Sequence, residues 1–255
     1  MFDEPFADGN TIIHRVDPRF RLTALIIGAV CLAALQRTES AAAGLAGSAA
    51  LLALSRPPLE PLLRRVLAVN LFIAFVWLTV PATMPGDPFA VLGPLRLSRQ
   101  GVELAALVTL KSNAILFLGV ALAATMSSPT LGHALHKLHC PPKLVFLFLF
   151  ACRYIHVIAQ EHRRLNTAAR LRGFAPRTSL HSYRTVSRIL GMVLARSHDR
   201  AMRVHEAMIL RGFDGSFRSV AAFHAVRGDG LFLAVTGAVL VSLVLLDRFP
   251  EVPGV

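Results

Sequence analysis

The sequence predicts an all-α, polytopic membrane protein with about five transmembrane helices and an interfacial helical region. Two observations support this fold class. Of the 255 residues, 54% are hydrophobic and only 16% are charged, a composition too apolar for a soluble domain of this length. Apolar runs of membrane character also alternate with short basic loops, and one long basic segment, 160–228, lies between them.

The N-terminal region, 1–142, is expected to hold four membrane spans. Two short apolar runs joined by a polar pentapeptide predict a tight transmembrane hairpin, and Pro57 and Pro58 end its second helix. Trp77 is placed as an interfacial anchor near the far end of the third run, and a Pro- and Gly-rich loop, 81–100, leads to the fourth. The four predicted spans lie near 22–35, 41–54, 66–80 and 101–124.

The rest of the chain is predicted to comprise a basic helical region, 143–228, and a C-terminal transmembrane helix within 229–255. Basic residues mark the cytoplasmic side, and the arginines of 160–228 belong there, so the apolar run 143–158 cannot complete a fifth crossing. We expect this run to begin a long helix in or against the inner leaflet, which leaves five crossings and an external C-terminus. The alternative is that 143–158 does cross and the count is six.

Several functions are disfavoured by composition. The net charge of +12 could suit nucleic acid, but the basic residues lack interleaved aromatic platforms, so no nucleic-acid partner is expected. No GxxxxGK[ST] phosphate loop occurs, and no cofactor motif or catalytic cluster stands out. The first twenty residues lack the order of a cleavable signal peptide, so the first span should serve as the anchor. We expect a multi-pass protein of the cell inner membrane that is not an enzyme.

One phrase occurs twice in the basic region. Ala168-x-x-Leu171-Arg172-Gly173-Phe174 recurs as Ala207-x-x-Leu210-Arg211-Gly212-Phe213. Each copy is predicted to end a helix, because glycine tolerates the left-handed conformation just beyond a helix end and a cation there opposes the negative end of the helix dipole. Each arginine can hold a carboxylate in two bonds at once. If the recurrence is not chance, the two identical helix ends suit a partner made of two like subunits, each with the same binding site for one helix end.

An apolar stripe lies between the two copies. Its spacing of i, i+3, i+4, i+7 and i+8 predicts an amphipathic helix, or a pair of helices broken near 197–199. The opposite face is basic, so the helix could lie on anionic membrane lipid, form a docking surface for a protein, or both. The stripe consists of Val186, Ile189, Leu190, Val193 and Leu194.

These features resemble the transmembrane T component of energy-coupling-factor transporters, and within it the cobalt branch, CbiQ. The resemblance covers most of the chain. It is carried by His14-Arg15-Val16-Asp17-Pro18-Arg19, the loop from Pro81 to Pro94, Thr125 to Pro129, Arg153-Tyr154 and the two Arg-Gly helix ends.

The resemblance implies a function for the twin helix ends. In that family, paired Ala-Arg-Gly motifs end coupling helices, and their arginines dock in two ATP-binding-cassette ATPase subunits. The matching residues here are Arg172-Gly173 and Arg211-Gly212. This chain has leucine where the family motif usually has alanine, a departure expected to affect packing behind the arginine more than its charge.

The resemblance further implies that the chain passes ATPase motion to a membrane substrate-capture subunit, for uptake of cobalt(II). A nickel or vitamin transporter of the same kind is the alternative. Two rivals from other classes are a self-sufficient channel or carrier and a polytopic membrane enzyme. The enzyme would need carboxylates or histidines clustered at one membrane depth, and the apolar runs contain no such cluster.

Two further groups of polar residues invite a function. His133, His136, His139 and Cys140 have spacings that could place metal ligands on one helical face, but an interfacial helix that uses histidine explains them as well, and no metal site is assigned. Lys111 and Asn113 fall within the fourth predicted span, where a charged or amide side chain is expected to face the bundle interior rather than lipid.

Overall fold

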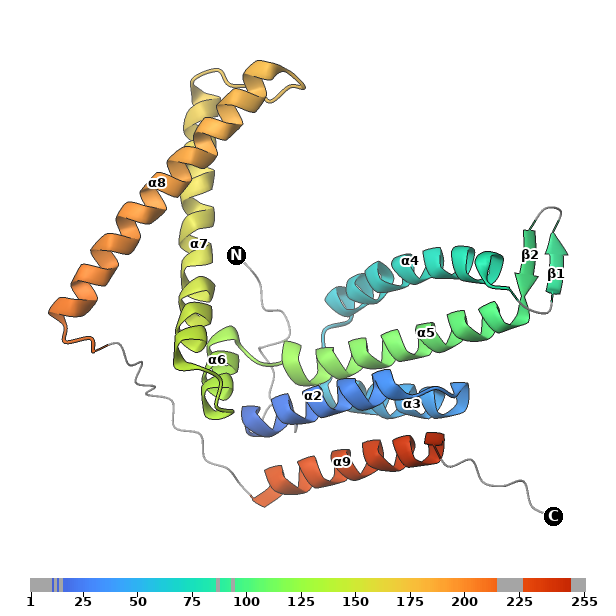
Figure 1. Ribbon diagram of the computed structural model, residues 1–255. Coiled ribbons are helices and arrows are strands. Elements are labelled where there is room, and N and C mark those ends of the chain that lie inside the picture. Colours follow the sequence, from blue (N-terminus) through green and yellow to red (C-terminus); the bar gives the residue numbers. More distant parts are fainter. Residues whose placement is uncertain are drawn as a thin grey trace, which may run out of the picture. The chain divides into compact units, whose positions relative to one another are not determined.

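The computed structural model describes residues 11, 13, 16–85, 88–92, 95–214 and 227–248. It confirms the all-α class (Figure 1), and the only strands in the described part form one short hairpin. The elements are α2 (Pro18–Ala34), α3 (Thr38–Ser55), α4 (Leu59–Thr83), β1 (Pro88–Leu92), β2 (Leu95–Ser98), α5 (Arg99–Gly119), the π-helical turn η1 (Val120–Ala124), α6 (Ser128–Lys137), α7 (Pro142–Leu171), α8 (Leu180–Leu210) and α9 (Arg227–Arg248).

The chain divides into two compact units. The first, referred to as the bundle, comprises 4–134 and 222–255. The second, referred to as the α7–α8 unit, comprises 135–221 together with 1–3. The last helix of the chain therefore belongs with the first ones, and α7 and α8 form a unit of their own.

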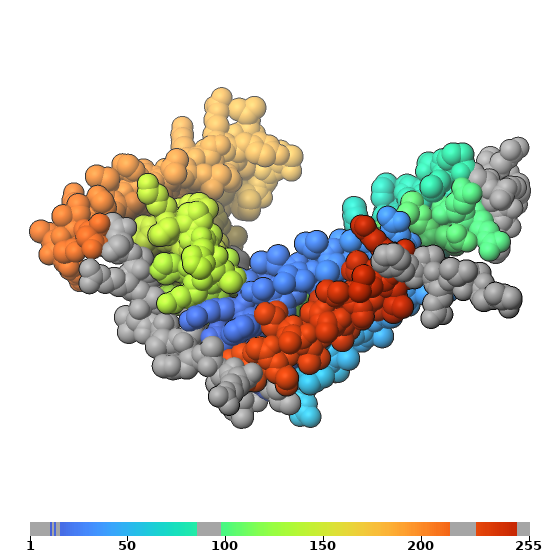
Figure 2. Space-filling view, turned by 60° about the horizontal axis from the view of Figure 1, so that its bottom comes forward, coloured from blue at the N-terminus to red at the C-terminus, as the bar shows by residue number. Residues whose placement is uncertain are grey.

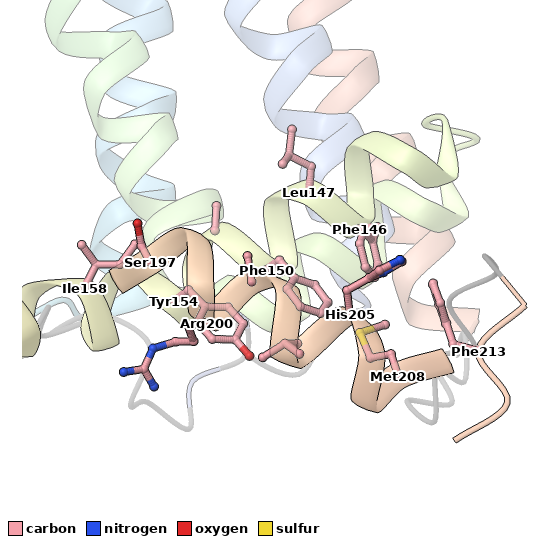
Figure 3. A pocket seen from close by; sticks show the side chains of 13 residues that line it. Phe146, Leu147, Phe150, Tyr154, Ile158, Ser197, Arg200, His205, Met208 and Phe213 are labelled. Atoms are coloured by element: carbon pink, nitrogen blue, oxygen red, sulfur yellow. The ribbon is translucent and has the colours of Figure 1, made fainter. Parts of the chain in front are cut away.

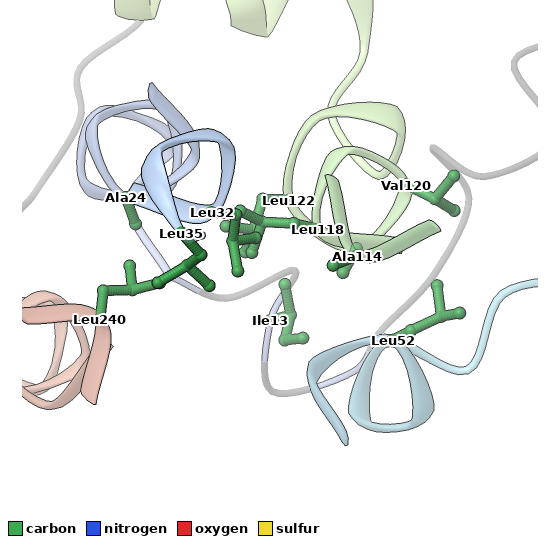
Figure 4. Packing of buried hydrophobic residues seen from close by; sticks show 11 residues of the cluster. Ile13, Ala24, Leu32, Leu35, Leu52, Ala114, Leu118, Val120, Leu122 and Leu240 are labelled. Carbon is green, nitrogen blue, oxygen red and sulfur yellow. The ribbon is translucent and has the colours of Figure 1, made fainter. Parts of the chain in front are cut away.

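Within the bundle, α5 packs along both α3 and α4, while α2 packs on α5 and α9. Figure 2 shows α9 lying along α2, so helices from opposite ends of the chain are neighbours. Side chains such as Leu32, Leu118 and Leu240 meet in the core (Figure 4). Gly28 permits this close approach, because a Cβ at that position would lie 2.6 Å from Cδ2 of Leu118.

Lys111 and Asn113 both bond to protein. The Lys111 ammonium donates to the carbonyl of Ala33 at 3.0 Å. Ala33 lies in the last turn of α2, where the negative end of the helix dipole stabilises a cation. The amides of Asn113 and Asn70 donate to each other at 3.0 and 3.2 Å and so join α5 to α4. Both polar side chains thus have partners within the bundle, and the expectation that they face its interior rather than lipid stays a prediction.

The end of η1 is held by a buried arginine. Arg21 is 2% exposed, and it donates to the carbonyl of Leu122 at 3.0 Å and to the hydroxyl of Thr125. A π-turn shifts the helical hydrogen-bond pattern, and here the arginine supplies a partner for a carbonyl of that turn. The contact fixes the start of α2 against the segment that leads out of the bundle into α6.

Four helices are long and apolar enough to cross a membrane: 59–83, 99–124, 142–171 and 228–248. The predicted spans 22–35 and 41–54 are not among them, since α2 has only 17 residues and α3 has 18 residues rich in alanine, glycine and serine. The apolar run 143–158 lies within one of the four. The number of crossings, and the side on which the C-terminus lies, therefore stay predictions.

The Pro- and Gly-rich segment 81–100, expected to be a loop, contains the β1–β2 hairpin. Its strands pair antiparallel, with Pro88 opposite Ser98 and an irregularity in register between Pro88 and Ala90. Strands of five and four residues are too short to show a clear alternation of apolar and polar residues. The hydroxyl of Ser98 then accepts from the backbone N–H of Gly101 at 3.0 Å and begins α5.

Candidate functional site

The two long helices of the α7–α8 unit carry the repeated phrase at their C-terminal ends. The chain continues as one helix from the apolar run 143–158 into the charged stretch, so α7 has 30 residues. The 31-residue α8 is also unbroken, which excludes a break near 197–199. Ser179 begins α8, because its hydroxyl accepts from the backbone N–H of Ser182 at 3.3 Å.

An ion pair joins α7 to α8. Arg196 donates to Oε1 of Glu161, and Nη1 of Arg164 lies 4.0 Å from Oε2 of the same carboxylate. Glu161 follows the apolar run 143–158, and its hydrogen bond from Arg196 lowers the pKa of this carboxyl below its ordinary value. The pair therefore links the middle of α8 to the second half of α7.

The first tip, residues 171–174, ends α7 in a Schellman motif. Arg172 is the last residue near helical geometry, and Gly173 adopts the left-handed conformation with φ of +85°. The N–H of Gly173 donates to the carbonyl of Arg170 at 3.0 Å, and that of Phe174 donates to the carbonyl of Ala169 at 3.0 Å. These two bonds satisfy carbonyls that the helix end would otherwise leave free.

The second tip, residues 210–213, has the same backbone. Gly212 has φ of +80°. Its N–H donates to the carbonyl of Ile209 at 2.9 Å, and the N–H of Phe213 donates to the carbonyl of Met208 at 3.0 Å. Both copies of the phrase therefore end a helix in one and the same motif, as the sequence predicted.

Both arginines of the tips are exposed, and so are the leucines before them. Leu171 is 85% exposed and Leu210 is 88% exposed, the highest values among large apolar side chains in the described residues. Each leucine is the last residue of its helix, where no following turn covers it. The expectation that leucine in place of alanine affects packing behind the arginine more than its charge stays a prediction.

A basic groove adjoins the first tip. It has a volume of about 480 Å³ and runs between the end of α7 and the first half of α8. Arg172, Arg188 and Arg196 line it together with Phe174. Arg196 is paired with Glu161, and the other two guanidinium groups give the groove a positive charge that favours an acidic partner.

An apolar groove adjoins the second tip (Figure 3). It has a volume of about 500 Å³ and lies between the first half of α7 and the second half of α8. Phe213 stacks on Phe146 with ring centroids 5.7 Å apart, and the stack continues along α7 through Phe150 and Tyr154 with spacings of 4.4 and 5.6 Å. This aromatic ladder fixes the second tip to the start of α7. Its i, i+4, i+8 spacing on α7 was the signal in the sequence that could have revealed it.

The predicted apolar stripe on α8 is divided between two environments. Ile189 is 7% exposed and Val193 is half-buried, and both lie toward α7, in its grooves with α8. Val186, Leu190 and Leu194 are exposed in the unit. One edge of the stripe thus packs α8 on its neighbour, and the other edge is available for contact with lipid or protein.

The histidine cluster does not form a metal site in the described part of the chain. No group of three or more His, Cys, Asp or Glu side chains lies close enough there to hold an ion. His139 instead takes the left-handed conformation, with φ of 62°, and the N–H of Cys140 donates to the carbonyl of Leu135 at 3.2 Å. These residues end α6 as glycine does at the two tips.

Comparison with known proteins agrees with this architecture. Residues 9–221 match the model of the CbiQ family, described as cobalt transport protein. The chain belongs to the CbiQ family. A CbiQ-family chain with four helices suited to crossing a membrane is a multi-pass protein of the inner membrane.

Individual relatives of this CbiQ-family chain differ in what their names say they transport. The cobalt transport protein CbiQ of Rhodobacter capsulatus is 28% identical over 61% of this chain and 65% of its own length. The nickel permease LarQ of Lactiplantibacillus plantarum is 29% identical over 44% of this chain and 40% of its own. The energy-coupling factor transporter transmembrane protein EcfT of Heliobacterium modesticaldum is 26% identical over 88% and 90%, respectively. The chain thus spans less than two thirds of the first two proteins.

Proposed function

We propose that this chain is the transmembrane coupling subunit of an energy-coupling-factor importer for cobalt(II). The observation that carries the proposal is the pair of exposed Leu-Arg-Gly-Phe tips with one backbone geometry. The similarity to EcfT, which extends over most of both chains, supports the same function.

Two ATP-binding-cassette ATPase subunits are the partners that the twin tips suit. Two equal subunits offer the same socket twice, and each socket can take one guanidinium through a carboxylate or through the carbonyls of a helix end. ATP-driven closure of the ATPase pair would move the two tips, and α7 and α8 are the rigid elements attached to them. The chain itself would perform no covalent chemistry.

A membrane substrate-capture subunit is the second proposed partner. The exposed edge of the stripe, Val186, Leu190 and Leu194, gives α8 an apolar surface that the α7–α8 unit does not cover. The arginines on the same helix suit the anionic surface of the inner leaflet. Motion of the tips would reach the capture subunit through α8, with anionic lipid around it.

Cobalt(II) is the proposed substrate because the family model and the Rhodobacter relative both bear that name. Nickel is the specific alternative, since LarQ matches at similar identity over a shorter stretch. The capture subunit would recognise the ion. The choice between cobalt and nickel would therefore depend on that partner, and the tips would be the same for both.

Reconstitution into liposomes tests the proposal. The complete complex should show ATP-dependent uptake of radiolabelled Co²⁺, with excess unlabelled Ni²⁺ competing weakly. The purified chain alone should neither hydrolyse ATP nor pass Co²⁺. Ion flux through the chain alone would show a channel or carrier, and stronger competition by Ni²⁺ than by Co²⁺ would assign the complex to nickel.

A further inference from the structure

The two tips share more than their arginines. Leu171 and Leu210 are the last residues of two helices with the same terminal hydrogen bonds, and both side chains are almost fully exposed. Successive residues of a helix point about 100° apart around its axis. Each tip therefore presents a leucine and an arginine on adjoining sides, in the same relative arrangement at both sites.

An exposed leucine at such a position is not needed for the fold. At a helix end that the chain leaves largely uncovered, alanine would serve nearly as well, because it has the higher helix propensity and the exposed leucine buries little surface within the unit. The sequence nevertheless places leucine at both tips, beside the group that we assign to docking. The same apolar side chain at two equivalent points indicates a shared apolar contact.

The alternative of insertion into the bilayer fits the geometry poorly. The two tips lie at opposite ends of α8, whose 31 residues extend over about 46 Å. A bilayer surface requires only apolar area and positive charge, and it imposes no fixed angle between one leucine and one arginine. The same pair of side chains on the same terminal hydrogen bonds at both tips instead favours two equal binding sites on protein.

We propose that Leu171 and Leu210 are the apolar anchors of the two docking sites, an inference that rests on the proposed function. Each leucine enters a small apolar pocket of one ATPase subunit, and the neighbouring arginine binds an acidic group at the rim of that pocket. A centre of apolar contact beside a charged rim is the usual anatomy of a strong protein contact. The sockets are therefore expected to combine an apolar wall with a carboxylate.

The test measures ATPase binding by variants of the full chain in lipid nanodiscs, at about 0.1 M and about 1 M salt, where the Debye lengths are about 10 and 3 Å. Loss of one buried leucine contact weakens binding about 10- to 100-fold. Leu171→Ala and Leu210→Ala should each show this loss at both salt concentrations. Arg172→Glu and Arg211→Glu should show a loss that is largest at low salt.

Matched variants separate the possible explanations. Met202→Ala removes a long apolar side chain that is 48% exposed on α8 and lines none of the grooves, and it should bind as the unaltered chain does. Leu171→Met with Leu210→Met should retain most of the affinity. The melting temperature of each leucine variant in detergent should be nearly unchanged, because the tip leucines bury little surface within the unit.

Three outcomes overturn the inference. If both leucine variants bind normally while the arginine variants fail, the tips dock by charge alone and the proposed function stands. If the leucine variants bind ATPase normally but expose α8 of the full chain to protease in nanodiscs of anionic lipid, the leucines are membrane anchors. Normal binding by all four variants would instead contradict the proposed function.

Discussion

The two tips have the same backbone but different surroundings. At the first, the groove beside the arginine is lined by further arginines. At the second, the groove is apolar, and Phe213 continues an aromatic ladder on α7. The local phrase determines how each helix ends, whereas the path of α8 across α7 determines what lies beside it. The two tips therefore share a backbone geometry but are held in place by different forces.

The largest expected difference concerns the phenylalanine that ends each tip. Phe213→Ala removes a stacked ring and part of an apolar groove, so it should lower the free energy of unfolding by about 2 kcal/mol. Phe174→Ala should cost less, because the groove at that tip is lined by charged groups. Denaturant unfolding in detergent measures both, and Phe213→Leu, which keeps apolar volume, should recover part of the loss. Equal losses at both tips would contradict the assigned difference in surroundings.

The glycines should instead behave alike. Gly173→Ala and Gly212→Ala each place a side chain in the left-handed region, which costs about 1–2 kcal/mol. A Cβ at either position meets no atom within 4 Å, so the cost is conformational and should be equal at both tips. Gly191→Ala, in the middle of α8 and equally open, is the control and should stabilise the protein by roughly 0.5–1 kcal/mol. Unequal losses would show that the two motifs are not equivalent.

The smallest expected effect concerns the crossing of the two helices. The pKa of Glu161 is lowered by its hydrogen bond from Arg196, so the stabilisation is present at neutral pH and is lost as pH falls through the lowered value. The free energy of unfolding should be slightly smaller at pH values below the ordinary carboxyl pKa of about 4.3 than at pH 7. Glu161→Gln should abolish this difference. Because Arg196 also lines the basic groove, any effect on docking should be confined to the first tip. A loss at the second tip alone would refute this assignment.

The helix ends could be predicted from sequence because their determinants are local. Gly173 and Gly212 need only their own φ angle and the preceding turn. The length of α7 was equally readable, since no proline or glycine interrupts it. The exposure of Leu171 and Leu210 was missed, because it depends on what lies in space beyond a helix end. The contact of η1 with Arg21 joins residues about a hundred positions apart. The division of the α8 stripe between two environments depends on how α8 packs on α7. The two short strands are adjacent in sequence, but they are too short to show a period of their own.

Charge reversal at the tips tests the central claim most directly. Removal of one arginine from a desolvated charged contact costs about 2–5 kcal/mol. Arg172→Glu and Arg211→Glu should each weaken ATPase co-purification, and the double variant should abolish it while the protein still inserts into the membrane. Arg203→Glu, an exposed arginine of α8 that lines neither groove, is the control and should have little effect. If the double variant assembles with the ATPase and supports transport as the unaltered chain does, the twin phrase serves only to end two helices, and the account is wrong.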